Sequence, residues 1–167
     1  MTCSGSWRNR DWSRFTVSRA QKFLQLSTSE KWMLFQALLL LPLCAVVLPL
    51  WGFRRLVPAF GESFSTAFTT EPGIAREQAC ATARMVSLAA RYGPYQATCL
   101  KQSMVTLWLL RHQGIPCHVR IGVRRESNPF QAHAWVEYQG EALNEGPGIH
   151  ERFVPFDRIV PREVSWT

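Results

Sequence analysis

Apolar residues recur every three or four positions in two stretches of the chain, residues 74–92 and 98–113. This period predicts two amphipathic helices. Gly93-Pro94 and Gly114 mark their ends, since glycine and proline stop a helix. In the first helix, the apolar stripe expected to face the core consists of Ile74, Ala81, Met85, Leu88 and Ala89.

The period changes to two after these helices, which predicts strands over residues 117–125 and 131–138. In the second strand His133, Trp135 and Glu137 fall on one face, because side chains alternate across a strand. A third short strand is expected to end near Glu145, and the tail from residue 146 is interpreted as a closing loop packed on the core. Two helices followed by a small sheet predict an α+β fold.

An uncharged stretch of different character lies between Lys31 and Arg54. Ser27 and Glu30 form a capping-box pattern just before it, which predicts a helix start. The apolar part, residues 33–50, is long enough to span a bilayer, yet Pro42 and Pro49 each remove a backbone hydrogen bond. Two alternatives stay open: a buried or membrane-surface pair of helices, or a true span.

The positive charge of the protein is concentrated at its N-terminus. The formal net charge is +7. Residues 1–55 carry eight Lys/Arg and two Asp/Glu, giving +6, and the remaining residues carry eleven and ten, giving +1. Such a basic arm suits an anionic membrane surface or an acidic peptide. Nucleic acid is disfavoured as a partner, because no zinc-finger spacing or RNA-binding aromatic motif accompanies the charge.

Composition and length favour one folded domain with an appendage. We therefore divide the chain into a basic, apolar helical region with its connector, residues 1–70, and a main domain, residues 71–167. Five cysteines form an odd set without a C-x-x-C pair, which argues against a disulfide framework or a structural zinc site and favours reduced, mostly buried thiols. We expect neither a metal nor a cofactor.

One cysteine, one histidine and one carboxylate occur in the order that thiol chemistry needs. Cys99 begins the second helix, His133 lies within a strand, and Glu145 follows the third strand. A thiol attacks carbonyls as the thiolate, and the positive end of a helix and an imidazole partner both stabilise that form. Unpaired N–H groups at the helix start can hold a developing oxyanion. A carboxylate or amide at position 145 or 144 can orient the imidazole.

Each of these residues also has an ordinary structural interpretation. A cysteine at a helix start is more often structural, a histidine beside Ala and Trp on a strand is often part of the packing, and Glu145 is a plausible solvated carboxylate. Between Glu145 and Asn144, the sequence leaves the identity of the orienting residue open. Gln96 is a candidate second oxyanion donor from its position beside Cys99. His112 cannot partner Cys99, since a helix rises about 1.5 Å per residue and separates them by about 20 Å.

Several short motifs together resemble the lasso-peptide maturation proteases, the transglutaminase-like leader peptidases within the papain-like cysteine hydrolases. The resemblance covers roughly residues 74–160. The motifs are Cys99-Leu-x-x-Ser103, Gly114-Ile-Pro116, Arg120-Ile-Gly-Val123, Ala132-His-Ala-Trp-Val-Glu137, Leu143-Asn-Glu145 and Glu151-Arg-Phe-x-Pro-Phe156.

The resemblance implies a papain/transglutaminase-like fold and a cysteine endopeptidase that removes the leader from a ribosomally made precursor. It implies Cys99 as nucleophile, His133 as base and then acid, and Glu145 as orienter, where the family often has Asp. The implied partners are the lasso precursor, a winged-helix leader-recognition protein and an asparagine-synthetase-like cyclase, with membrane-surface contact through residues 33–50 as a further option. The implied location is cytoplasmic, with or without membrane association. Two rivals remain: a non-catalytic adaptor that presents the precursor, and a true transglutaminase.

Overall fold

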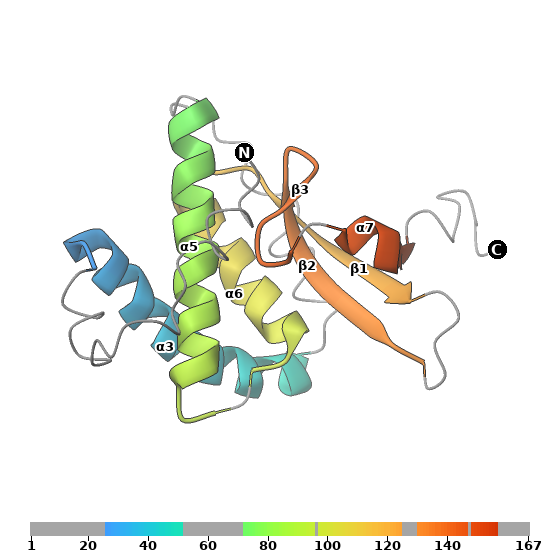
Figure 1. Cartoon of the computed structure of the whole chain (residues 1–167). Coiled ribbons are helices and arrows are strands. Elements are labelled where there is room, and N and C mark those ends of the chain that lie inside the picture. Colours follow the sequence, from blue (N-terminus) through green and yellow to red (C-terminus); the bar gives the residue numbers. More distant parts are fainter. Residues whose placement is uncertain (1–25, 52–71, 96, 125–129, 147, 157–167) are drawn as a thin grey trace, which may run out of the picture.

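The computed structural model describes residues 26–51, 72–95, 97–124, 130–146 and 148–156 (Figure 1). The helices are α3 (Thr28–Trp51), α5 (Pro72–Tyr92), α6 (Cys99–His112) and α7 (Ile149–Arg152). The strands are β1 (His118–Arg124), β2 (Ala132–Tyr138), β3 (Glu141–Ala142) and β4 (Phe153–Pro155). The predicted α+β class is confirmed.

Helices α5 and α6 pack on one another and separate two hydrophobic cores. The first core joins them to the sheet and includes Ala79, Leu110 and Val136. The second joins them to α3 and includes Leu41 and Leu109. Because both cores use α5 and α6, α3 and the sheet are held by the same pair of helices (Figure 1).

The sheet is antiparallel with the strand order β3-β2-β1-β4. Its register sets Gly122 of β1 opposite His133 of β2. The third strand is shorter than expected, since β3 ends at Ala142 and Glu145 lies in the segment after it. The interpretation of the tail as a closing loop is wrong, because residues 149–152 form α7 and residues 153–155 pair with β1 as β4.

The apolar run forms one continuous helix, α3, so the expected helix pair is wrong. Both Pro42 and Pro49 lie inside it. The capping box is confirmed: the Glu30 N–H donates to the Ser27 hydroxyl (3.2 Å), and the Ser27 N–H donates to the Glu30 carboxylate (2.9 Å). By length and composition α3 is the one helix of the described chain that is long and apolar enough to cross a membrane.

Contacts along α3 hold it to the rest of the fold. Glu30 forms an ion pair with Arg84 of α5. The Tyr95 hydroxyl donates to the Leu38 carbonyl oxygen at 2.6 Å, which ties the segment before Cys99 to α3. Burial raises the pKa of that hydroxyl.

Two further expectations change in α5. Of the predicted apolar stripe, Met85 and Ala89 are buried as expected, whereas Ile74 is exposed. The buried face of α5 also includes Ala75, Ala79, Ala83 and Val86, which pack in the two cores that α5 shares with α6. Cys80 is disulfide-bonded, so the expectation of reduced thiols is wrong at this position. Cysteine spacing along the sequence reports on near neighbours and does not detect pairs between distant segments.

Candidate functional site

Cys99 is the first residue of α6, as the sequence predicts, and its side chain is half-buried. Thr98 occupies the N-cap position with extended dihedrals (φ −67°, ψ 161°), but its side chain makes no capping hydrogen bond. The N–H of Gln102 donates to the Thr98 carbonyl oxygen at 3.0 Å. The three N–H groups before it precede the intrahelical ladder, so they are available to an external acceptor such as an oxyanion. Gln96 lies outside the described residues.

His133 and Glu145 are in direct contact. The imidazole Nε2 lies 2.6 Å from the Glu145 Oε1, and both side chains are roughly three-quarters buried. An ionised carboxylate accepts hydrogen bonds, so this contact favours the tautomer that carries its proton on Nε2. In this tautomer the other nitrogen, Nδ1, carries a lone pair and can accept a proton.

Aromatic packing fixes the direction of the histidine ring. The centroid of the Phe153 ring lies 5.2 Å from that of His133. On the same face of β2, the fully buried Trp135 reaches across to Gly122, where a β-carbon would lie 2.8 Å from the indole. A glycine at this position therefore leaves room for Trp135 beside the histidine.

A buried carboxylate completes this face of the sheet. Glu137 is 7 % exposed and accepts hydrogen bonds from the Trp135 indole N–H (2.9 Å) and from the Arg120 Nε–H (3.0 Å). His150 Nε2 lies 3.5 Å from the same carboxylate. The charge on Glu137 is thus compensated within the network.

Asn144 is used differently from its neighbour Glu145. Its Oδ1 accepts a hydrogen bond from the Val136 N–H (2.8 Å), and its Nδ2 donates to the Ser103 hydroxyl (3.4 Å). Ser103 is four residues after Cys99, hence on the same side of α6 one turn later. The segment that carries Glu145 is therefore attached to the helix that Cys99 begins, and of these two neighbours it is Glu145 that contacts His133.

The sequence comparisons bear on this arrangement. A family model described as "Transglutaminase-like superfamily" matches residues 44–157. The chain belongs to the transglutaminase-like superfamily. The match begins inside α3 and runs to the end of β4, so in this transglutaminase-like chain it crosses the expected domain boundary at residue 71.

Part of the chain is also similar to a curated protein. The chain is 33% identical over 58 residues to the microcin J25-processing protein McjB of Escherichia coli. The aligned segment is 35% of this chain and 27% of that relative, so the chain spans about a quarter of the relative's length. No solved structure matches the chain.

Burial disfavours the ionised form of two other described thiols of this transglutaminase-like chain. Burial raises the pKa of Cys117 to about 12, although Arg111 partly opposes the shift. Burial also raises the pKa of Cys44, with Lys101 opposing it. Both thiols are therefore poorly ionised at neutral pH, which argues against either as a nucleophile.

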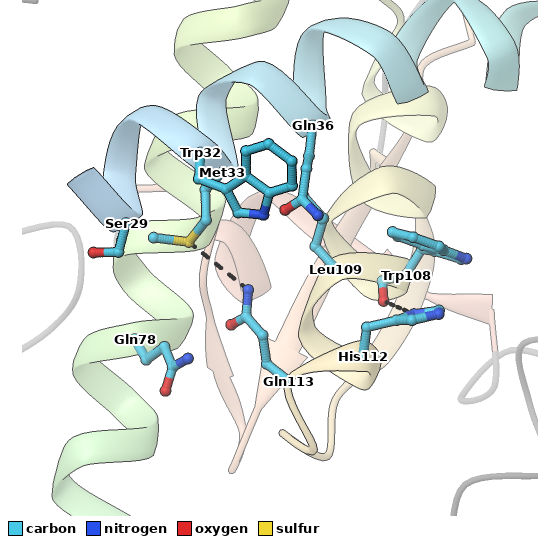
Figure 2. A pocket seen from close by; sticks show the side chains of 9 residues that line it. All are labelled: Ser29, Trp32, Met33, Gln36, Gln78, Trp108, Leu109, His112 and Gln113. Carbon is cyan, nitrogen blue, oxygen red and sulfur yellow. Dashed lines mark hydrogen bonds between the residues drawn. The ribbon is translucent and has the colours of Figure 1, made fainter. Parts of the chain in front are cut away.

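A hollow of about 320 Å³ lies away from Cys99, between the first turns of α3, the middle of α5 and the last turns of α6 (Figure 2). Trp32, Met33 and Gln113 are among its lining residues. Two of its lining residues pack against each other: the rings of His112 and Trp108 are tilted by 31° with their centroids 3.7 Å apart, and the His112 Nδ1 lies 2.9 Å from the Trp108 carbonyl oxygen. His112 is thus engaged at the opposite end of α6 from Cys99. In the described residues no cluster of His, Cys, Asp or Glu suits a metal ion.

Sequence reasoning missed two residues that support the histidine. Phe153 falls in the tail interpreted as a loop, although its alternation with Pro155 is compatible with a strand. The close contact at Gly122 could have been predicted, because a glycine inside a strand pattern often marks a position that another group approaches closely.

Proposed function

We propose that this protein is a cysteine endopeptidase that removes the leader peptide from a lasso-peptide precursor. The observation that carries the proposal is the 2.6 Å contact between His133 and Glu145, on a segment attached to the helix that begins at Cys99. Membership of the transglutaminase-like superfamily and similarity to a microcin J25-processing protein support a peptide-processing role.

The proposed reaction uses Cys99 as nucleophile. His133 takes the thiol proton on Nδ1, and the thiolate attacks the carbonyl carbon of the scissile peptide bond. The oxyanion is held by N–H groups at the start of α6, worth on the order of 3 kcal/mol each. When the intermediate collapses, the C–N bond breaks, His133 returns the proton to the leaving amine, and a thioester remains on Cys99.

Hydrolysis of the thioester completes the cut. Water attacks the thioester carbonyl while His133 accepts its proton, and the C–S bond then breaks to release a carboxylic acid and the free thiol. Glu145 is the positioning residue: its carboxylate holds the Nε2–H and stabilises the imidazolium that forms in each half-reaction. No cofactor enters this scheme.

The proposal extends to the partners and the cellular location. The precursor arrives bound to a winged-helix leader-recognition protein, and an asparagine-synthetase-like cyclase then closes the released core peptide. We place the reaction in the cytoplasm, where the precursor is synthesised.

The test is incubation of the purified protein with a lasso-type precursor, with and without the leader-recognition partner, followed by mass spectrometry. We expect two fragments that together equal the precursor plus one water, and none with Cys99→Ala or His133→Ala. A folded wild-type protein that leaves the precursor intact in the presence of the partner would contradict the protease and favour the adaptor. A product about 17 Da lighter than its combined substrates, with ammonia released, would instead identify a transglutaminase.

A further inference from the structure

Large apolar side chains form a continuous exposed row along α3. The row consists of Trp32 (60 % exposed), Phe35 (51 %), Leu39 (57 %), Leu43 (56 %), Val46 (58 %) and Leu50 (72 %). We call these six residues the α3 stripe. Their spacing of three or four residues places them within about 80° of the helix circumference, at 100° per residue, over a length of about 27 Å.

The opposite side of α3 is buried against the rest of the fold. Ala37 and Leu41 are fully buried in the core shared with α5 and α6, and they lie roughly opposite the α3 stripe on the helical wheel. The helix therefore has one face inside the fold and one apolar face outside it. Contiguous exposed apolar surface of this kind marks an interaction site.

Charge around the α3 stripe indicates what covers it. No charged residue occurs between Lys31 and Arg54, whereas Arg54 and Arg55 follow the helix directly in sequence. Residues 1–55 as a whole carry a net charge of +6, from eight basic and two acidic residues. An apolar helix face with basic flanking sequence is the pattern of proteins that lie on anionic bilayers. A second copy of this chain would bring two such basic regions together, which is electrostatically unfavourable.

The contacts of α3 also determine how it meets a bilayer. If α3 spanned the bilayer, Leu41 would have to leave the core that it shares with α5 and α6. Arg84 of α5, which forms an ion pair with Glu30 of α3, would be drawn towards the membrane with the helix. Burying charged groups of α5 in hydrocarbon is costly. If α3 instead lies parallel to the membrane surface, these contacts are kept and only the α3 stripe enters the bilayer. The stacked pair Trp32 and Phe35, whose ring centroids are 5.8 Å apart, then lies at the headgroup level that aromatic rings prefer.

We propose that the α3 stripe docks this protein parallel to the surface of an anionic membrane. Since α5 and α6 lie between α3 and the sheet, a membrane on the stripe is separated from the sheet by these two helices (Figure 1). Docking does not depend on the proposed peptidase activity, and its test needs no precursor.

The test is co-sedimentation of the full chain with vesicles of phosphatidylcholine, with and without about a quarter phosphatidylglycerol. We expect the wild-type protein to bind the anionic vesicles and to be released by raised salt. The double variant Leu39→Gln/Leu43→Gln should bind at least about tenfold more weakly, because two exposed leucines no longer enter the bilayer. Ile74→Gln is the matched control, since Ile74 is equally exposed (59 %) but lies on α5. It should bind as the wild type does.

Several results would overturn the proposal. One is equal binding by the double variant and the wild type, and another is failure of the folded wild-type protein to bind either vesicle. A wild-type dimer that becomes a monomer in the double variant would assign the stripe to a second copy. Resistance of the membrane-bound protein to carbonate extraction would indicate a span. Loss of binding to the leader-recognition protein, with vesicle binding unchanged, would assign the stripe to that partner.

Discussion

Oε1 of Glu145 lies 2.6 Å from Nε2 of His133, while the preceding residue, Asn144, reaches the backbone of Val136 and the hydroxyl of Ser103. Two adjacent polar residues of one segment thus have separate tasks. Glu145 contacts the imidazole, and Asn144 fastens the segment to the strand and the helix. This division makes their mutational effects distinguishable.

Substitution of Glu145 should slow cleavage without unfolding the protein. Glu145→Gln keeps the size of the side chain but removes its charge, so the imidazolium loses stabilisation and the preferred tautomer is less well fixed. We expect kcat/KM to fall by about 10- to 10³-fold, less than after loss of Cys99 or His133. The measurement is precursor cleavage followed by mass spectrometry. A wild-type rate for Glu145→Ala would remove Glu145 from the proposed site.

Substitution of Asn144 should lower stability first. Asn144→Ala leaves the N–H of fully buried Val136 without its acceptor, which costs about 1–3 kcal/mol in the free energy of unfolding. Asn144→Asp retains an oxygen acceptor and should lose markedly less. Urea titration of both variants measures the difference. Equal losses would show that the Val136 bond contributes little.

The three free thiols of the described chain should differ in reactivity. Iodoacetamide near pH 7.5 should modify Cys99 in the folded protein and leave Cys117 unmodified, because burial raises the pKa of Cys117 to about 12. Peptide mapping after brief labelling measures this. Cys99→Ala is the control, and rapid labelling of Cys117 in the native protein would contradict the buried environment.

The buried thiol of Cys117 should make the free energy of unfolding depend on pH in the alkaline range. The folded-state pKa of Cys117 lies above the ordinary value of about 8.5, so the unfolded chain loses its proton first as pH rises. The stabilising contribution is complete below about pH 8.5 and is lost progressively towards pH 12. Cys117→Ala should flatten the decline in unfolding free energy over this window. An unchanged slope would contradict the shift.

Gly122 should tolerate no side chain. A β-carbon there would lie 2.8 Å from both the Trp135 ring and the Val154 carbonyl oxygen. Overpacking of this kind costs about 1–3 kcal/mol, so Gly122→Ala should lower the melting temperature and weaken cleavage by displacing Trp135 near His133. Gly73→Ala is the control, since it meets nothing within 4 Å and should be neutral or stabilising. Matching melting curves for the two variants would contradict this account.

Local patterns in the sequence were sufficient to predict most of the helices and strands around the candidate site. The capping box at Ser27 predicts the start of α3, and the periods of the apolar residues predict α5, α6, β1 and β2 to within a residue or two. The contact of His133 with Glu145 could be anticipated but not distinguished from one with Asn144, because the choice depends on how the chain turns after β3. The order of residues 143–145 in the sequence does not show which side chain this turn directs towards His133.

Other features depended on tertiary contacts. Pro42 and Pro49 suggest a break, yet α3 continues through both, since burial of Leu41 and neighbouring residues against α5 and α6 stabilises the continuous helix. Strand β4 is short and forms because β1 offers it an edge. The period of α5 predicts the burial of Met85 and Ala89. The burial of Ala75, Ala79 and Ala83 depends on packing against α6 and the sheet, which the sequence of α5 alone does not specify.

The hydrogen bond from the Tyr95 hydroxyl to the Leu38 carbonyl oxygen has a practical consequence for the design of shortened variants of this chain. The loop that delivers Cys99 to its position is anchored on a helix more than fifty residues earlier in the chain. A fragment shortened to about residues 74–160, where the family motifs lie, would lose that anchor together with Ala37 and Leu41 of the second core. A minimal working unit therefore has to begin ahead of α3.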